Sequence, residues 1–258
     1  MKNFYEQKEV WEKYREDIEK RVETYYREAI SLIPADVESV LDAGCGEGTF
    51  LSLLHHGYRL VGLDASITAL RYAKAAMVWG SLDNLPLKSN SFDLVTTLET
   101  LEHLKQDTFF DALAELKRVA RKYIIVSVPN DEPLEYYLVV CPSCGCHFNA
   151  VGHVRSFSRD SLEKLFYPEF SLQTIIETGD IVEYPTYNKV IFVALRSYIK
   201  PKPPRDAICP QCGYRMDEEK DRISYSEMPV SLRVLKRVTD FIWRPKKRVY
   251  HFLALYEK

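Results

Sequence analysis

The sequence predicts an α/β protein with a doubly wound, mostly parallel sheet, preceded by a helix and interrupted by a cysteine-bearing insertion. Three observations predict it. Short apolar runs alternate with helical patterns between residues 40 and 129, which is typical of parallel βαβ units. A glycine loop separates the first apolar run from the first of these helices. Two Cys-Pro-x-Cys-Gly segments stand far apart, after the alternation has ended.

The composition excludes several classes of protein. The chain has 258 residues and 46% hydrophobic residues, which suits one α/β domain with an elaboration and excludes disordered or collagen-like chains. Its longest apolar runs are far shorter than a membrane span. Residues 1–17 are dense in charge and lack the apolar region of a secretory signal. We therefore expect a soluble, cytoplasmic protein.

Charge is distributed unevenly along the chain. The net charge of −2 argues against a general nucleic-acid binder. Residues 231–258 nevertheless carry eight Lys or Arg against two acidic residues. Such a basic tail indicates either a local contact with an acidic partner or a solvated basic face.

Each element follows from its own pattern. Residues 4–33 show helical spacing of apolar residues, and Pro34 ends that helix. Ser66 caps a later helix. The expected strands are 40–41, 58–64, 78–79, 92–99, 123–129 and 170–177, and the expected helices between them are 49–56, 66–77, 107–121 and 158–166. Residues 249–256 or 190–195 supply the last strand, and the sequence does not decide between them.

The glycine loop indicates a cofactor site. Gly44, Gly46 and Gly48 follow a strand and open a helix, so that the backbone there is open to close approach by a ligand. Asp64 ends the next strand, where doubly wound folds hold a ribose diol. A nicotinamide dinucleotide would need the spacing G-x-G-x-x-G. The spacing here is G-x-G-x-G, and Asp42 just before it would repel a pyrophosphate but attract an ammonium group.

The loop and three later segments together resemble the class I, Rossmann-like S-adenosylmethionine-dependent methyltransferases of the small-molecule and sugar type. Residues 40–50 resemble the first motif of that family, 80–87 its adenine loop, 91–95 its fourth-strand motif and 98–104 the segment after that strand. The resemblance is close over residues 36–130 and looser over 158–177 and 249–256. It implies a seven-stranded sheet and an S-adenosylmethionine cofactor.

The resemblance also implies a role for individual residues. The cofactor-binding residues would be Asp42, Gly44, Cys45, Gly46, Gly48, Asp64, Ala65, Ser81, Leu82 and Glu99. Among them, Asp42, Gly44 and Glu99 would lie near the methionine part, Asp64 would hold the ribose and Leu82 would pack near the adenine. The family often has Asp where this chain has Ser81, so a hydroxyl or the backbone would replace that contact. Because no catalytic His/Asp pattern accompanies Cys45, we interpret it as a small buried residue.

Two further polar segments are candidates for chemistry. His103 follows the fourth strand and is the candidate general base, the alternative being a helix-start histidine that contacts backbone. Glu102 is the weaker candidate. Residues 152–158 resemble the segment that faces the acceptor in small-molecule methyltransferases, and Arg155 there would bind an acidic group or cap structure.

The two cysteine segments predict a structural zinc site with the ligands Cys141, Cys144, Cys209 and Cys212. A disulfide interpretation would need an oxidising compartment. Cys146 and His147 are surplus, and either could replace a knuckle cysteine.

The expected domain organisation follows from these sites. Residues 1–34 would cover the cofactor site, and 35–177 with 248–258 would form the methyltransferase core. Residues 131–157 and 178–247 would be zinc-stapled loops that form a lid over the acceptor pocket. The basic helix 231–243 would form a pocket wall, the alternative being that 231–248 makes a weak contact with an anionic membrane surface.

The predicted activity is methyl transfer from S-adenosylmethionine to a small-molecule or glycan acceptor, with oxygen as the atom methylated and no nucleic acid involved. Two alternatives remain from the sequence. One is a non-catalytic zinc-binding scaffold with this fold, which the intact loop and Asp64 argue against. The other is a nicotinamide-dependent oxidoreductase, which the glycine spacing and Asp42 argue against.

Overall fold

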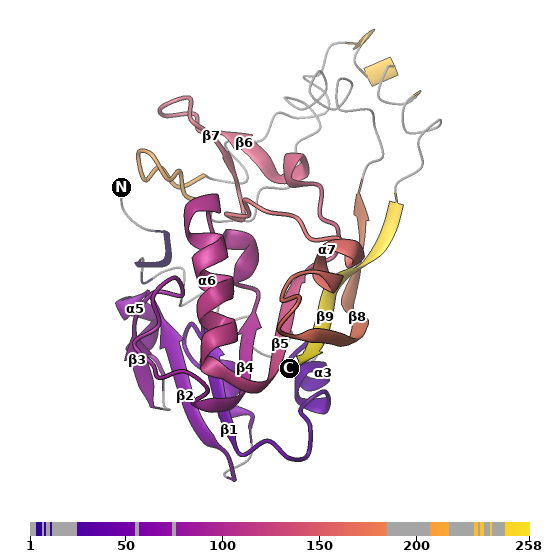
Figure 1. The fold of residues 1–258 in the computed structure, drawn as a ribbon. Coiled ribbons are helices and arrows are strands. Elements are labelled where there is room, and N and C mark those ends of the chain that lie inside the picture. The colour runs from indigo at the N-terminus through magenta and orange to yellow at the C-terminus, as the bar shows by residue number, and fades with distance from the viewer. Residues whose placement is uncertain are drawn as a thin grey trace. The chain divides into compact units, whose positions relative to one another are not determined.

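The computed structural model describes residues 4–6, 8, 11, 25–54, 57–73, 76–184, 207–216, 230–231, 233–234, 238 and 246–258 (Figure 1). The chain divides into two compact units. The core unit comprises Asn3–Glu132, Val154–Asp180 and Val249–Lys258. The cysteine unit comprises Met1–Lys2, Pro133–His153 and Ile181–Arg248. The predicted coverage of the cofactor site by residues 1–34, and the predicted lid, stay predictions.

The sheet has seven strands in the order β3-β2-β1-β4-β5-β9-β8. Neighbours from β3 to β5 pair in parallel, and β9 pairs antiparallel with β5. The bounds are β1 Ser39–Ala43, β2 Arg59–Asp64, β3 Met77–Trp79, β4 Phe92–Leu98, β5 Ala120–Pro129, β8 Ser171–Tyr184 and β9 Lys246–Glu257. The expected α/β fold with a mostly parallel seven-stranded sheet is confirmed. The strand expected at 249–256 lies within β9, and its competitor at 190–195 lies outside the described residues.

Among the described residues of the core unit, the helices are short except for α6. They are η1 Phe4–Glu6, α3 Arg27–Ser31, α4 Thr49–Ser52, α5 Ile67–Leu70, η3 Leu101–His103, α6 Gln106–Val119 and α7 Arg159–Glu163. Ser158 caps α7 as part of a capping box with Ser161. Of the helix expected over 4–33, the described residues include η1, α3 and the helical positions 8, 11, 25 and 26, and residues 12–24 lie outside the described part of the chain.

Four of the expected helices end earlier than predicted: α4 at Ser52, α5 at Leu70, α6 at Val119 and α7 at Glu163. The helix expected over 66–77 ends at Leu70, and Met77 begins strand β3. Met77 pairs in register with Gly62 of β2, so its backbone hydrogen bonds go to the sheet. The pairing that removes Met77 from a helix is a long-range contact, which local helical spacing does not reveal.

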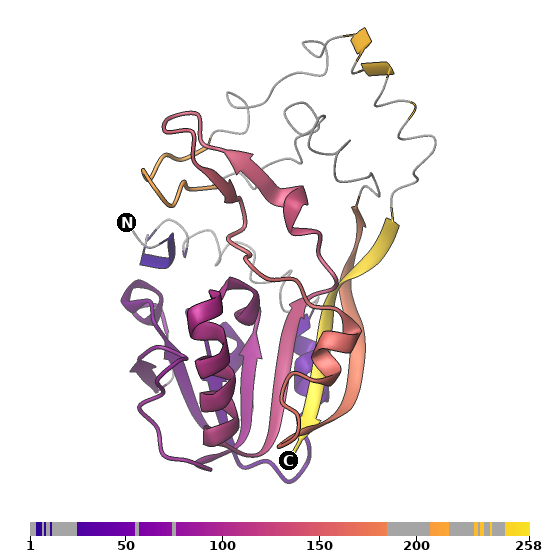
Figure 2. The same ribbon diagram turned by 45° about the horizontal axis from the view of Figure 1, so that its top comes forward.

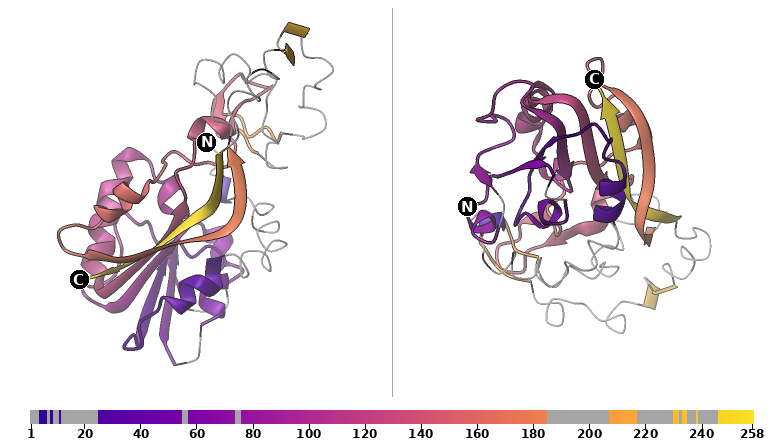
Figure 3. Two further views of the ribbon diagram at one scale, coloured as in Figure 1. Left: turned by 90° about the vertical axis from the view of Figure 1, so that its right-hand side faces the viewer. Right: turned by 90° about the horizontal axis from the view of Figure 1, so that it is seen from below.

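Successive strand residues pack on opposite faces of the sheet, as the strand pleat requires. Val40, Leu94 and Ile125 join one apolar cluster with Tyr26 and Ala29 of the α3 side. Their neighbours Leu41, Val95 and Val126 join the other cluster, with Leu116 of α6 and Leu162 of α7. Figure 3 shows α6 and α7 on one face of the sheet and α3 on the other. Both faces of the central strands are therefore buried, as in a doubly wound fold.

The described part of the cysteine unit is built on a hairpin. Strands β6 Leu138–Val140 and β7 His147–Asn149 pair antiparallel after η4 Leu134–Tyr137. A small apolar cluster joins Val139, Phe148 and Ala150 of this region to Ala207 and Cys209. Figure 2 shows the segment that contains Ala207 and Cys209, in orange, beside the hairpin. The predicted basic helix 231–243 lies largely outside the described residues, although several of its positions are helical. Within the described part of the chain, no helix is both long and apolar enough to span a membrane.

Candidate functional site

A cavity of about 320 Å³ lies where the ends of β1, β2 and β4 meet the following loops. Eight of the ten residues predicted to bind cofactor line it: Gly44, Cys45, Gly46, Asp64, Ala65, Ser81, Leu82 and Glu99. His103 lines it as well. The other two, Asp42 and Gly48, are not among its lining residues. Ligands of doubly wound sheets bind at the carboxyl ends of the strands, and this cavity is at that edge.

The glycine loop adopts a backbone that favours glycine. Gly44, Gly46 and Gly48 all have positive φ, of 86°, 54° and 77°. A Cβ on Gly44 would stand 2.4 Å from the Thr100 hydroxyl oxygen, so this glycine makes room for a neighbouring side chain as well as for a ligand. Gly48 is the N-cap of α4 and lies against Met77 and not in the cavity wall.

Asp64 anchors the loop from the end of β2. Its Oδ2 accepts a hydrogen bond of 2.8 Å from the Gly46 amide, and its Oδ1 accepts one of 2.7 Å from the Ser66 amide. Burial raises the pKa of this carboxyl, and the two amides oppose that shift. A carboxylate has about four acceptor positions, so the two oxygens retain capacity for hydroxyl groups of a ligand.

Asp42 lies beneath the loop and is only 3% exposed. Its Oδ1 accepts a hydrogen bond of 2.7 Å from the Thr96 hydroxyl. Burial, together with the negative charges of Asp64 and Glu47, raises the pKa of Asp42 to about 7. Asp42 therefore lies behind the cavity wall and changes its charge near neutral pH.

This burial leads to a prediction about stability. The unfolded-state pKa of an aspartate is about 3.9, and the folded-state pKa of Asp42 is higher, so the folded protein holds a proton that the unfolded chain releases. The free energy of unfolding should therefore fall as pH rises from 5 to 7.5. In Asp42→Asn that fall should be smaller, as measured by urea unfolding of the ligand-free protein at the two pH values.

Asp93→Asn is the matched control. The pKa of Asp93 is lowered, because hydrogen bonds from Ser39 and Glu38 and the charge of Arg121 outweigh its desolvation. Asp93 is therefore ionised in both states across this pH window, and its variant should keep the wild-type pH dependence. A wild-type pH dependence in Asp42→Asn would show that Asp42 is ionised when folded.

Glu99 enters the cavity from the end of β4 in a strained backbone conformation. Its φ is 52°, which is uncommon for a residue other than glycine. Oε1 accepts a hydrogen bond of 2.5 Å from the Ser127 hydroxyl of β5. Oε2 lies 3.2 Å from Nε2 of His251 in β9. Both carboxylate oxygens thus have polar partners on neighbouring strands.

Glu102 and His103 follow in the short η3 turn. Glu102 is fully buried, and burial with the nearby charges of Glu99 and Glu132 raises its pKa well above the usual range. His103 is 16% exposed and lies edge-on to the Tyr5 ring at 5.4 Å. His103 therefore reaches the cavity, whereas Glu102 does not line it.

Cys45 has the environment of a structural residue. It is buried against Met77, with the two sulfur atoms 3.7 Å apart. Burial and the charges of Asp42 and Asp64 raise the pKa of the thiol. A thiolate is the nucleophilic form of cysteine, and this environment disfavours it.

Several lining residues were not predicted to bind cofactor. They are Tyr5, Trp11, Tyr25, Tyr26, Glu47, Ser66, Leu98, Thr100 and Leu104. The aromatic residues come from the N-terminal segment, where their helical spacing equally suits a core position. The Trp11 indole donates to the Tyr5 carbonyl at 2.6 Å, and the Ser66 hydroxyl donates to the same carbonyl at 2.6 Å. These contacts join η1 to the Asp64 loop.

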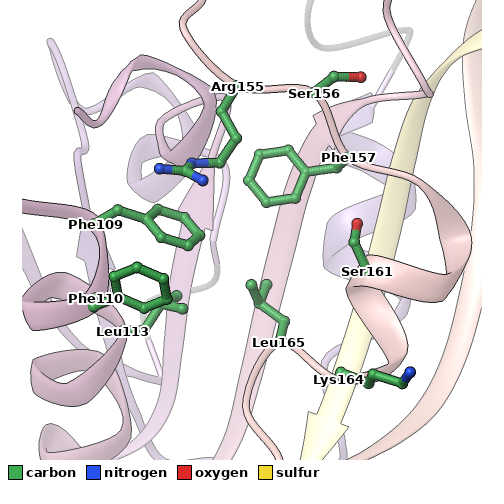
Figure 4. A pocket seen from close by; sticks show the side chains of 9 residues that line it. All are labelled: Phe109, Phe110, Leu113, Arg155, Ser156, Phe157, Ser161, Lys164 and Leu165. Atoms are coloured by element: carbon green, nitrogen blue, oxygen red, sulfur yellow. The ribbon is translucent and has the colours of Figure 1, made fainter. Parts of the chain in front are cut away.

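Arg155 lines a different cavity, of about 240 Å³, between α6 and α7 (Figure 4). Its guanidinium carbon stands 3.6 Å above the Phe109 ring, and Nη2 donates to Gln106 at 2.9 Å. Phe110, Phe157 and Leu165 complete the apolar wall. The two cavities share no lining residue, so the structure does not bring Arg155 together with the glycine loop.

The two cysteine knuckles are brought together in the cysteine unit. The sulfur atoms of Cys141, Cys144, Cys209 and Cys212 all lie within 4.8 Å of one another. Cys141 is 3.5 Å from Cys212 and Cys144 is 3.6 Å from Cys209. Four sulfurs at 2.3 Å from a tetrahedral zinc would be about 3.8 Å apart, so the donor set fits this ion.

Both knuckles have the same backbone geometry. The Gly145 amide donates to Cys141 O, and the Gly213 amide donates to Cys209 O, each at 2.9 Å. The two glycines have φ of 71° and 74°. Burial opposes ionisation of Cys209, but backbone donors, mainly from Cys212, and the neighbouring thiols lower its pKa to about 6. Cys146 instead directs its thiol to the His147 carbonyl.

Comparison with known proteins is consistent with this site. Residues 41–125 match a family model described as a methyltransferase domain. A probable S-adenosylmethionine-dependent methyltransferase of Mycolicibacterium smegmatis is 36% identical over 99 residues, which is 35% of this chain and 38% of that protein. An uncharacterized protein of Methanocaldococcus jannaschii is 34% identical, over 40% of this chain and 49% of that protein.

Two more distant proteins complete the comparison. A ubiquinone biosynthesis O-methyltransferase of Bartonella quintana is 27% identical over 41% of this chain and 47% of its own length. The chain thus spans less than half the length of these curated relatives. The crystal structure of a SAM-dependent methyltransferase from Archaeoglobus fulgidus has the same fold, with a TM-score of 0.52 and 16% identity over 95% of this chain and 94% of that one.

Proposed function

We propose that this protein is an S-adenosylmethionine-dependent methyltransferase that methylates an oxygen atom of a small molecule or glycan. The observation that carries the proposal is one cavity lined by the glycine loop, Asp64 and Glu99 at the carboxyl edge of the sheet. The methyltransferase-domain match over residues 41–125 spans the same loop and both carboxylates.

The lining residues fit the chemical groups of this cofactor. Asp64, held by the Gly46 and Ser66 amides, would accept hydrogen bonds from the ribose hydroxyls. Glu99, with Asp42 beneath, supplies negative charge for the amino group of the methionine part. Leu82 is buried and would pack against the adenine, with the backbone of Ser81 beside it. When bound, the cofactor supplies an activated methyl group on a sulfonium.

The protein's own part in methyl transfer is positioning and proton removal. His103 is the titratable side chain that follows Glu99 and Thr100 along this cavity wall. We propose that a ring nitrogen of His103 takes the proton of the acceptor hydroxyl. The adjacent Tyr5 ring would hold the imidazole at the cavity edge.

An oxygen acceptor is favoured by the likeness to the Bartonella quintana O-methyltransferase. A small-molecule or glycan acceptor is favoured over a nucleic acid by the net charge of −2, because nucleic-acid binding relies on a cationic surface. We also propose that Cys141, Cys144, Cys209 and Cys212 hold one structural zinc. Four sulfur ligands leave no coordination position for catalysis.

Incubation with radiolabelled S-adenosylmethionine and fractionated small-molecule and glycan pools tests the activity. Label should move to a product whose mass rises by one methyl group, identified by mass spectrometry. His103→Gln should bind cofactor normally and slow the transfer by about 100-fold, the usual contribution of a general base. Cofactor binding without transfer to any pool would favour the non-catalytic scaffold instead.

A further inference from the structure

We infer that His251 is a positioning residue for the cofactor's amino group, acting through Glu99. The inference rests on the proposed function, because it assigns Glu99 to the cationic end of the bound cofactor. His251 belongs to the last strand, β9, and lies far along the sequence from the glycine loop at residues 44–48. His251 does not line the cavity itself, so its effect on a ligand passes through the Glu99 carboxylate.

The contact between the two residues is short and sheltered. Nε2 of His251 is 3.2 Å from Oε2 of Glu99, and the two side chains are 8% and 20% exposed. Ser127 holds the other oxygen of Glu99. Because Ser127 belongs to β5 and His251 to β9, the two carboxylate oxygens are contacted from two strands of the sheet. A carboxylate held in this way needs little reorganisation to receive a cationic group.

The fold makes specific room for the imidazole. A Cβ on Gly179 of β8 would stand only 2.7 Å from Nδ1 of His251, and Gly179 has φ of 94°. The Tyr25 ring also packs against the imidazole, with ring centres 4.7 Å apart. Nδ1 is buried and has no hydrogen-bond partner among the described residues. Buried polar groups normally have a polar partner, and for this imidazole that partner is Glu99, which Nε2 contacts.

A comparison of two probe ligands separates this role from a merely structural one. S-adenosylhomocysteine carries the amino-acid group, whereas 5′-methylthioadenosine has the same nucleoside and thioether without it. In His251→Leu, the affinity for S-adenosylhomocysteine should fall about tenfold or more, as for loss of one charge-assisted hydrogen bond. The affinity for 5′-methylthioadenosine should change less than about twofold, since no amino group contacts Glu99.

His251→Gln is the conservative variant, because its amide can donate to Glu99 from a similar position. It should keep the affinity for S-adenosylhomocysteine within about threefold of wild type. Glu99→Gln should likewise lose affinity for S-adenosylhomocysteine but not for 5′-methylthioadenosine. This variant provides the test if His251→Leu does not fold. Arg155→Ala, in the separate cavity, should bind both ligands as the wild type does.

Three results would count against the inference. Equal weakening of both ligands in His251→Leu would assign His251 to general packing and leave the proposed function standing. Equal loss of S-adenosylhomocysteine affinity in the Gln and Leu variants would show that donation to Glu99 is irrelevant. Failure of the wild-type protein to bind either ligand would overturn the proposed function, and the inference with it.

Discussion

Asp64→Ala is expected to lower the affinity for S-adenosylmethionine by about 10²- to 10⁴-fold, measured by calorimetry. The wild-type carboxylate would make two charge-assisted hydrogen bonds to the ribose, each contributing about 1.5–3 kcal/mol. It also fixes the cavity wall by accepting from the Gly46 and Ser66 amides. The substitution therefore removes both the ligand contacts and the support of the loop that forms them.

Asp111→Ala provides the control for this effect. Asp111 is an exposed acidic residue of α6 and does not line the cavity, so its loss should change the affinity less than about twofold. Asp64→Asn should fall between wild type and Asp64→Ala, because the amide retains one acceptor oxygen but not the charge. Wild-type affinity in a folded Asp64→Ala protein would exclude this cavity as the cofactor site.

Cys209→Ser is expected to abolish the binding of about one zinc per chain, measured by elemental analysis of protein purified without added metal. Structural zinc sites contribute about 10–16 kcal/mol in small domains, so the cysteine unit should lose its order with the ion. Residues 133–153 and 207–216 share one small apolar cluster around Cys141 and Cys209. They should therefore become sensitive to proteolysis in the variant.

Cys146→Ser tests whether the zinc ligands are the right four. Its thiol is directed to the His147 carbonyl and does not belong to the group of converging sulfurs, so the variant should keep its full zinc content. Full zinc content in Cys209→Ser would contradict the ligand set. Loss of zinc in Cys146→Ser alone would move Cys146 into it.

The sequence alone predicted the features that depend on neighbours along the chain. Strand alternation, the glycine spacing around Gly46 and the capping of α5 by Ser66 are local patterns, and the structure contains each of them. Residues such as Val40 and Leu41 point to opposite faces because the period of a strand is two. The two cysteine knuckles were likewise predictable, since each is one turn of chain with glycine directly after its second cysteine.

Only the tertiary structure decided which distant residues meet. It placed Met77 in β3 because that backbone pairs with Gly62, and it buried Asp42 under the loop so that its pKa rises to about 7. It also inserted β9 between β5 and β8, which sets His251 against Glu99. No local pattern encodes these outcomes. Strand order and register bring such residues together, and they result from packing the whole sheet at once.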